Sequence, residues 1–285
     1  MLRIGLVTRW GNYPAEFFAR HRFQSAELVI WPDDDLSPLR HGLGPLRQVQ
    51  GELAAHQVVI SALAHYDNHL DPSRQPALRE HFTALLDGAG KLGIPIVAGF
   101  TGRDPERSIE DNIPAYREYW TPLARRAEDA GVRIAFENCP KFRTHPFRGG
   151  NIAFTPKAWD LMFDALPSRA VGIEWDAAHL VCMLIDPIAT IRRYGDRIYH
   201  VHAKDAEVRW EIVREHGIFD ERACRHRMVG LGQTHWADAI SALLEAGYDG
   251  DLNIEGRHDP IYRDEREVAG LLVARDTLLR YLPVS

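Results

Sequence analysis

Residues 116–137 read YREYWTPLARRAEDAGVRIAFE and contain one complete helix–strand unit. Tyr116–Ala130 has the spacing of an amphipathic helix, and Gly131 stands where helices commonly end. The apolar run Arg133–Glu137 that follows is typical of a buried strand. The stretch therefore predicts a helix that returns the chain directly into a strand.

The same alternation recurs along the chain. Short β-branched or apolar runs predict strands at Ile4–Thr8, Leu28–Ile30, Val58–Leu63, Ile96–Ala98, Arg133–Glu137, Val171–Asp176, Ile198–Ala203 and Asp251–Glu255. Segments with helical periodicity lie at Ala15–Arg20, Leu46–His56, Ala77–Leu92, Tyr116–Ala130, Pro156–Leu166, Pro187–Tyr194, Trp236–Ala246 and Asp264–Tyr281. Strands joined by helices run parallel. Eight such units in 285 residues favour a single (β/α)8 TIM-barrel domain, residues 1–285, over an open doubly wound sheet.

Composition narrows the classes of function. Hydrophobic residues make up 45% of the chain, which is sufficient for a large core. A formal net charge of -6 argues against nucleic acid and anionic membranes as partners. No apolar run approaches the roughly 20 residues that cross a bilayer, and no signal peptide is evident at the start. We therefore expect a cytoplasmic enzyme with a small-molecule substrate. A homo-oligomer is left open.

Cysteine usage points to the same compartment. The chain has three cysteines, Cys139, Cys182 and Cys224, and no C-x-x-C spacing. A sparse, odd count indicates free thiols in a reducing environment.

Four predicted strands end on side chains that bind metals. Glu137, Asp176, His202 and Glu255 occupy these positions. Because the active site of such a barrel lies at the C-terminal ends of its strands, we expect the four side chains at one rim. Each acid taken alone is more often a helix cap or a salt-bridge partner. Three carboxylates crowded together would repel one another without a cation. Three carboxylates and an imidazole suit one divalent ion, with Mn²⁺ expected and Mg²⁺, Co²⁺ or Zn²⁺ as alternatives.

The motifs around these residues resemble a known family. Glu137-Asn138-Cys139-Pro140, Trp175–Leu180, His202-Ala203-Lys204-Asp205 and Ile254-Glu255 resemble the sugar phosphate isomerase/epimerase family of xylose-isomerase-like TIM barrels. The resemblance runs over nearly the whole chain. It implies a metal bound by Glu137, Asp176, His202 and Glu255, and a substrate-binding role for His179.

The resemblance also implies a reaction. A divalent metal would stabilise the enediolate formed when a proton is removed next to a carbonyl. Glu137 and Glu255 are the candidates for catalytic base and acid. Isomerisation or epimerisation of a sugar or keto-sugar is the leading hypothesis. The alternative is β-elimination by a lyase, dehydratase or deglycosidase acting on a keto-sugar or keto-inositol.

Other functions have less support. Ketose 3-epimerases of the family carry a second Glu and an Arg where this chain has Arg143 and Val208, which counts against that activity. An endonuclease IV-like repair enzyme would need additional metal ligands and a basic surface. A non-catalytic barrel would be favoured only if no metal bound.

Further residues are candidates for binding substrate. Lys204 either polarises a substrate oxygen or forms a salt bridge with a carboxylate. Arg227 lies in the long connection at 205–235 and is expected to bind a hydroxyl or carboxylate of the substrate. The alternative is that this connection is only a solvated excursion. His65, after the third strand, and Asn138, beside Glu137, complete the predicted set.

Overall fold

The computed structural model describes residues 2–141 and 149–282. Eight parallel strands close into a barrel in the order β1-β10-β7-β6-β5-β4-β3-β2. They are β1 Arg3–Thr8, β2 Ser25–Val29, β3 Val59–His65, β4 Ile96–Gly99, β5 Arg133–Glu137, β6 Val171–Asp176, β7 Ile198–Ala203 and β10 Asp251–Ile254. The predicted (β/α)8 barrel is confirmed.

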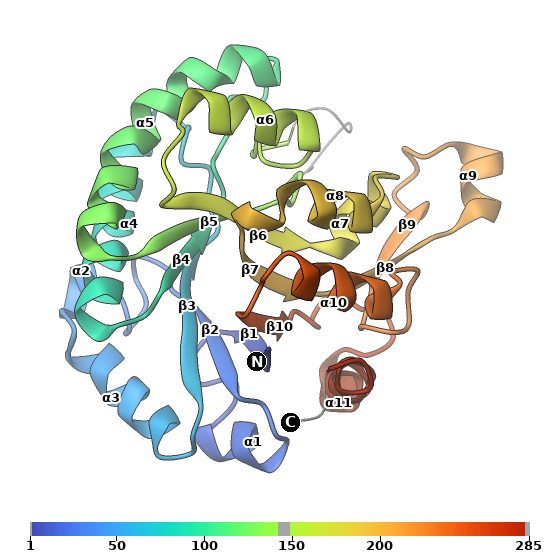
Figure 1. Ribbon diagram of the computed structural model, residues 1–285, viewed down its shortest axis with the longest axis horizontal. Helices are drawn as coiled ribbons and strands as arrows, with labels where there is room; N and C mark the ends of the chain where they lie inside the picture. The colour runs from blue at the N-terminus through green and yellow to red at the C-terminus, as the bar shows by residue number, and fades with distance from the viewer. Residues whose placement is uncertain (1, 142–148, 283–285) are drawn as a thin grey trace.

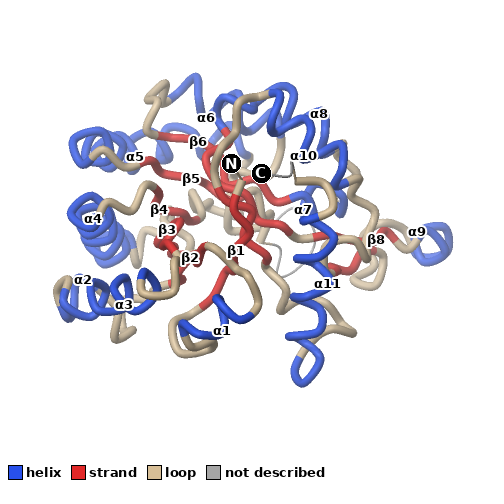
Figure 2. Tube along the Cα trace, turned by 60° about the horizontal axis from the view of Figure 1, so that its bottom comes forward, coloured by secondary structure: helices blue, strands red, loops and turns tan. Residues whose placement is uncertain are grey.

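Helices surround the strands (Figure 1; Figure 2). They are α1 Ala15–Arg20, α2 Pro38–His41, α3 Gly44–Ala54, α4 Gln75–Leu92, α5 Ile109–Ala130, α6 Pro156–Ala165, α7 Ala177–Cys182, α8 Pro187–Tyr194, α10 Trp236–Glu245 and α11 Glu267–Leu279. Short 3-10 turns lie at Gly195–Arg197 and Asp264–Arg266. The main hydrophobic core fills the layer between the strands and this outer ring, with Trp120, Trp159 and Trp175 among its fully buried side chains.

The helix ends follow their local chemistry. Gly131 ends α5 in a left-handed conformation with φ 68°, which costs glycine little because it has no side chain. Thr155 caps α6 by accepting a hydrogen bond from the Ala158 N–H. The prediction for α5 was too short at its start. The helix begins at Ile109, behind a Ser108 cap, and continues through Pro114 and Pro122.

Polar side chains fill part of the barrel interior. The Ser25 hydroxyl lies 2.9 Å from Asn253 Oδ1, and Asn253 Nδ2 donates to Ser61 at 2.6 Å. Gly5 is required beside them because a Cβ there would lie 2.2 Å from the Ser25 hydroxyl oxygen. This layer forms a packed floor for the barrel and leaves the C-terminal rim as the place for a site.

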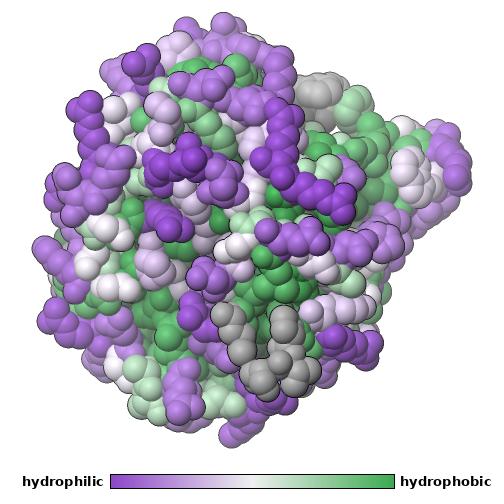
Figure 3. Space-filling model, in the orientation of Figure 1, coloured by the Kyte–Doolittle hydropathy of each residue, from purple (hydrophilic) through white to green (hydrophobic). Residues whose placement is uncertain are grey.

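The connection after β7 forms an excursion of its own. It contains β8 Asp205–Val208, α9 Trp210–His216 and β9 Cys224–Arg227, and β8 pairs with β9 in antiparallel fashion. Figure 3 shows it projecting from one side of the molecule, with hydrophilic side chains at its outer end. We call β8, α9 and β9 the hairpin excursion.

Candidate metal centre and substrate cavity

The four predicted ligands meet at the C-terminal rim of the barrel. Glu137 ends β5, Asp176 ends β6, His202 lies near the end of β7 and Glu255 directly follows β10. One ligand atom from each lies within 4.8 Å of the others, and all four side chains are almost completely shielded from solvent. The parallel strands bring together residues that are up to 118 positions apart in sequence.

Two atoms of this group are suited to hold an ion. His202 Nδ1 and Asp176 Oδ2 are buried and make no hydrogen bond of good geometry among the described residues, although Lys204 Nζ lies 3.0 Å from Asp176 Oδ2 as an ion-pair partner. His202 Nδ1 lies 3.4 Å from Glu137 Oε1 and 3.6 Å from Glu255 Oε2. Buried polar atoms without hydrogen bonds are rare and call for an explanation. A divalent cation supplies one, so the donor set fits a metal.

Asp176 is oriented by the start of α7. Its Oδ1 accepts hydrogen bonds from the backbone N–H groups of Ala178, at 2.7 Å, and His179, at 3.3 Å. The Asp176 backbone is fixed in turn by Asn138, whose side chain accepts from the Asp176 N–H and donates to its carbonyl. Asn138, predicted to bind substrate, therefore uses its side chain to hold Asp176.

A carboxylate that was not predicted lies behind His202. Glu27 on β2 is fully buried, and its Oε2 lies 2.9 Å from His202 Nε2. A hydrogen bond to one ring nitrogen sets the tautomer and directs the other nitrogen, Nδ1, to the metal position. Glu27 was missed because the second strand was predicted to begin at Leu28, whereas β2 begins at Ser25. An acid inside an otherwise apolar run was the signal available.

Tyr66 connects Glu27 to a second buried carboxylate. Its hydroxyl hydrogen-bonds Glu27 and lies 2.7 Å from Glu174 Oε2. Glu174 also pairs with His200 Nδ1 at 2.8 Å. Burial first, and then Glu174 and Glu27, raise the Tyr66 pKa well above its usual value, so the phenol stays protonated. The network is thus neutral at Tyr66 and charged around the histidines.

Charges inside the site are strongly coupled. Burial lowers the pKa of His202, but Glu174 and Glu27 outweigh it and raise the pKa well above 6.5. Burial opposes ionisation of Glu137, yet the neighbouring imidazoles of His179 and His202, 3.3 and 3.4 Å from Glu137 Oε1, hold its pKa below its usual range. The lowered pKa values of Glu137 and Glu255 keep these two carboxylates ionised, as binding of a metal requires.

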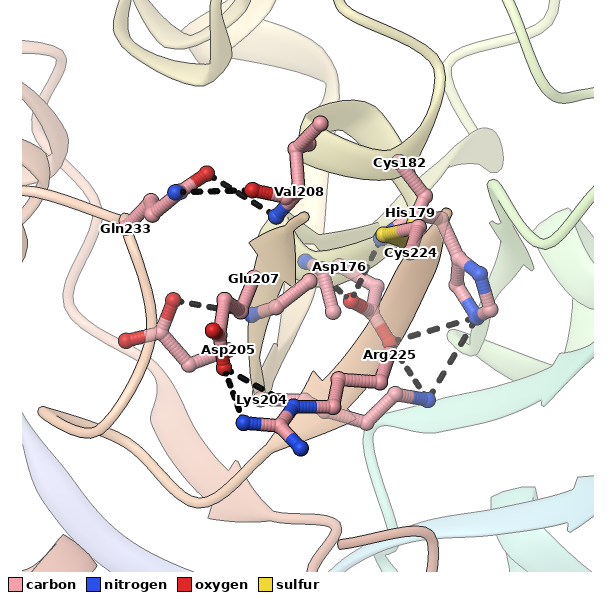
Figure 4. The surroundings of a disulfide bond; sticks show 12 residues. Asp176, His179, Cys182, Lys204, Asp205, Glu207, Val208, Cys224, Arg225 and Gln233 are labelled. Carbon is pink, nitrogen blue, oxygen red and sulfur yellow. Dashed lines mark hydrogen bonds and ion pairs between the residues drawn. A yellow bond between two sulfur atoms is a disulfide. The ribbon is translucent and has the colours of Figure 1, made fainter. Parts of the chain in front are cut away.

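Lys204 places a cation among these acids (Figure 4). Its Nζ lies 2.6 Å from Glu255 Oε2, 3.0 Å from Asp176 Oδ2 and 3.4 Å from His179 Nε2. Only 2% of its side chain is exposed. Burial alone would lower its pKa, but Asp176 and Glu255 raise it instead. The salt bridge predicted for Lys204 is present, and Lys204 also lines the cavity, while its role toward a substrate oxygen stays a prediction.

A cavity of about 200 Å³ that opens to solvent lies over the predicted ligands. Its lining includes Thr8, Arg9, Asn12, Tyr13, Tyr66, Phe100, Glu137, Lys141, His179, His202, Lys204, His226, Glu255, Arg257 and His258. His179 extends from α7 into this space with Nε2 3.3 Å from Glu137 Oε1. The predicted substrate-binding position of His179 is therefore next to the ligands.

The structure does not bring His65 and Arg227 to the cavity. His65 packs edge-on against Trp31, His69 and His81, and neither of its ring nitrogens has a hydrogen-bond partner among the described residues. Burial lowers its pKa to about 3. His65 is therefore a buried core histidine, and it does not line the cavity.

The Arg227 side chain lies on the face of β9 that points away from the cavity, where it forms two ion pairs. Its guanidinium pairs with Asp259 at 3.1 Å and with Glu207 at 3.0 Å. Both contacts fix the base of the hairpin excursion. Arg143, named above in the comparison with ketose 3-epimerases, lies outside the described residues.

The prediction of free cysteines was wrong at two positions. Cys182 at the end of α7 and Cys224 at the start of β9 form a disulfide with their Cα atoms 5.6 Å apart. Cys139 is free. The two partners are separated by 42 positions, and only the return of the hairpin excursion onto α7 brings them together.

Comparison with known proteins agrees with this geometry. The chain belongs to the family described as xylose isomerase-like TIM barrel, whose profile matches residues 16–275. The uncharacterized protein YfiH of Bacillus subtilis is 24% identical over 259 residues, with 79% of each chain covered. Inosose dehydratase of Lacticaseibacillus casei is 27% identical over 176 residues, which cover 58% of this chain and 56% of the relative.

Solved structures show the same fold. The IOLI protein, described with a bound zinc atom, is 19% identical and aligns with a TM-score of 0.75 over 99% of this chain and 100% of its own. A D-tagatose 3-epimerase-like protein is 21% identical, with a TM-score of 0.72 and 98% of each chain covered.

Among the described residues no helix is both long and apolar enough to cross a membrane.

Proposed function

We propose that this enzyme is a divalent-metal-dependent isomerase or epimerase of a sugar or keto-sugar, with Mn²⁺ as its ion. The observation that carries the proposal is the convergence of Glu137, Asp176, His202 and Glu255, whose ligand atoms lie within 4.8 Å of one another and include the buried His202 Nδ1, which makes no hydrogen bond among the described residues. Three carboxylates and one imidazole are a donor set typical of Mn²⁺. The zinc described in the IOLI structure supports a divalent ion in this fold.

The residues around the cavity are arranged for proton transfer. A divalent ion at this place would supply Lewis-acid stabilisation of negative charge on neighbouring substrate oxygens. Glu137 and Glu255 approach the cavity from two different strands, β5 and β10, and both line it. Each is ionised and can therefore accept a proton from a substrate carbon. The same group then returns the proton to the neighbouring carbon, which isomerises the substrate. For epimerisation the other glutamate must first take up a proton from solvent and then deliver it to the opposite face of the original carbon.

Two cationic or polar side chains would hold the substrate. Lys204 is kept protonated and donates hydrogen bonds at the cavity wall, next to Glu255. His179 faces the same space from α7. Charge on an oxygen of the substrate is favoured here because water is largely excluded.

A dehydratase acting on a keto-inositol is the second candidate. The inosose dehydratases among the relatives favour it, with identities of 27% to 29% over roughly half or more of the chain. The position where ketose 3-epimerases carry an arginine holds Val208, which is buried and bonds through its backbone to Gln233. In this reaction the carbanion formed by proton removal expels a β-hydroxyl, which leaves as water after taking up a proton.

Solvent-deuterium exchange distinguishes the two functions. The metal-loaded protein is incubated in D₂O with D-tagatose, with D-xylose and with an inosose, and the products are followed by NMR and mass spectrometry. Deuterium next to the carbonyl, with no loss of water, supports isomerisation or epimerisation. A product that lacks one molecule of water relative to its substrate would identify the dehydratase. The Glu255→Gln variant should lose exchange, and the proposal fails if the variant exchanges at the wild-type rate.

Further assignments follow from the same reasoning. The partner is a small sugar-like molecule and not nucleic acid, as the net charge of -6 indicates. A cytoplasmic location stays a prediction, and the Cys182–Cys224 disulfide counts against it because disulfides are uncommon in reducing compartments.

A further inference from the structure

The hairpin excursion is firmly attached to the rim of the barrel. Asp205 accepts hydrogen bonds from the backbone N–H groups of Gly230 and Thr234, at 3.1 and 2.9 Å. Gln233 bonds both backbone groups of Val208. Strand β9 is therefore held in one position relative to the cavity.

Strand geometry divides the side chains of β9 between two faces. Successive residues of a strand point to opposite sides. Arg227 faces Asp259 and Glu207. His226, one residue earlier, lines the cavity beside Lys204 and Glu255. The excursion thus presents an imidazole to the substrate space.

The His226 ring has no hydrogen-bond partner within residues 2–141 and 149–282. Its contacts are edge-on with the rings of His179, at 5.0 Å between centroids, and His258, at 5.7 Å. Burial, followed by the charges of Lys204 and His179, lowers its pKa to about 2. A neutral imidazole has one N–H donor and one acceptor nitrogen. That pair matches a hydroxyl group, which also donates and accepts.

A covalent link joins the elements that carry the two rings. Cys224 lies two residues before His226 and so on the same side of β9. Its partner Cys182 lies three residues after His179 on α7. Figure 4 shows the disulfide in the same region as His179 and Lys204. The Cys182–Cys224 bond therefore joins the two elements that carry His179 and His226.

We propose that His226 is a substrate-binding residue that hydrogen-bonds a hydroxyl of a polyhydroxylated substrate, and that the Cys182–Cys224 disulfide holds it in place. The proposal rests on the proposed function, since it assumes a sugar-like ligand in the cavity. It adds a specificity-determining contact from the hairpin excursion, on the wall that also carries His179 and His258.

The test measures binding of two unreactive polyols, myo-inositol and xylitol, to the Zn²⁺-loaded protein by ligand-observed NMR titration. His226→Phe keeps the ring packing and removes both nitrogens. We expect it to bind the better polyol about 3- to 10-fold more weakly, the effect of one lost hydrogen bond. His226→Gln, which keeps a donor and an acceptor, should recover part of the affinity. The matched control is His216→Phe, on the exposed end of α9, which should bind as wild type does.

Each outcome has a separate meaning. Equal affinity of His226→Phe and wild type overturns the role of His226 and leaves the proposed function standing. Absence of polyol binding to the wild type overturns the role of His226, and the deuterium-exchange experiment then decides the proposed function separately. The Cys182→Ser, Cys224→Ser double variant should bind 3- to 10-fold more weakly, and a phosphine reductant should weaken the wild type but not this variant. Unchanged affinity after reduction overturns the role of the disulfide.

Discussion

Glu27→Gln is the change that best tests how His202, the proposed metal ligand, is positioned. Glutamine keeps the shape of Glu27 and an oxygen acceptor 2.9 Å from His202 Nε2, but it removes the negative charge. Carboxylates that hydrogen-bond a metal-binding histidine contribute 10- to 100-fold to metal affinity. Since tenfold corresponds to about 1.4 kcal/mol, the binding free energy should weaken by about 1.4 to 3 kcal/mol. The complete burial of Glu27 places the effect near the upper end.

Isothermal titration of Mn²⁺ into the metal-free protein measures this effect. Glu174→Gln is the matched control, because Glu174 is equally buried but bonds His200 at 2.8 Å and lies farther, 3.3 Å, from His202. Its loss of affinity should be clearly smaller. Circular dichroism confirms that both variants fold. A Glu27→Gln variant that is folded and binds Mn²⁺ as tightly as wild type would refute the positioning of His202 by Glu27.

Three other properties can be predicted. Burial opposes protonation of His202, but nearby carboxylates raise its pKa well above 6.5, so ion binding at pH 7 should release about one proton and tighten as pH rises. Calorimetry in buffers of different ionisation enthalpy measures the release, and a value of zero would contradict it. Unfolded, unreduced protein should show one reactive thiol, Cys139, and reduction of Cys182–Cys224 should give three; three thiols before reduction would exclude the bond. His65 has its pKa lowered to about 3, so the unfolded chain takes up its proton first as pH falls below 6.5. Between pH 7 and pH 5 the wild type should therefore lose about 2 kcal/mol more of its free energy of unfolding than His65→Gln does, as measured by urea unfolding. Equal losses in the two proteins would disprove the lowered pKa of His65.

The barrel and the four rim residues could be predicted because both depend on local pattern. Alternating strand and helix periods specify parallel strands, and parallel strands end at one rim. Residues that end strands, such as Glu137 and Asp176, therefore come together whatever the intervening helices contain.

The rest depended on details that local pattern does not contain. The start of β2 could not be placed at Ser25, because Ser25 and Glu27 are not strand-favouring residues, and this hid Glu27. Arg227 was expected to bind substrate, but strand alternation turns it away from the cavity and brings in His226. A shift of one residue reverses the face of a side chain.

The disulfide needed information on tertiary structure. The pairing of Cys182 with Cys224 requires the excursion to fold back onto α7. A cysteine count cannot show that return. The expectation of free thiols rested on that count alone.

The most direct test of the central claim is the metal stoichiometry of wild type and Asp176→Asn, measured by elemental analysis after loading with Mn²⁺ and gel filtration. Asparagine keeps the Oδ1 acceptor that caps α7 but removes the charge at Oδ2. Asp186→Asn, a change of the same type at the cap of α8, is the control. We predict one ion per chain in wild type and in Asp186→Asn, and at least tenfold weaker binding in Asp176→Asn. No bound ion in wild type, or equal binding in Asp176→Asn, would contradict the metal centre.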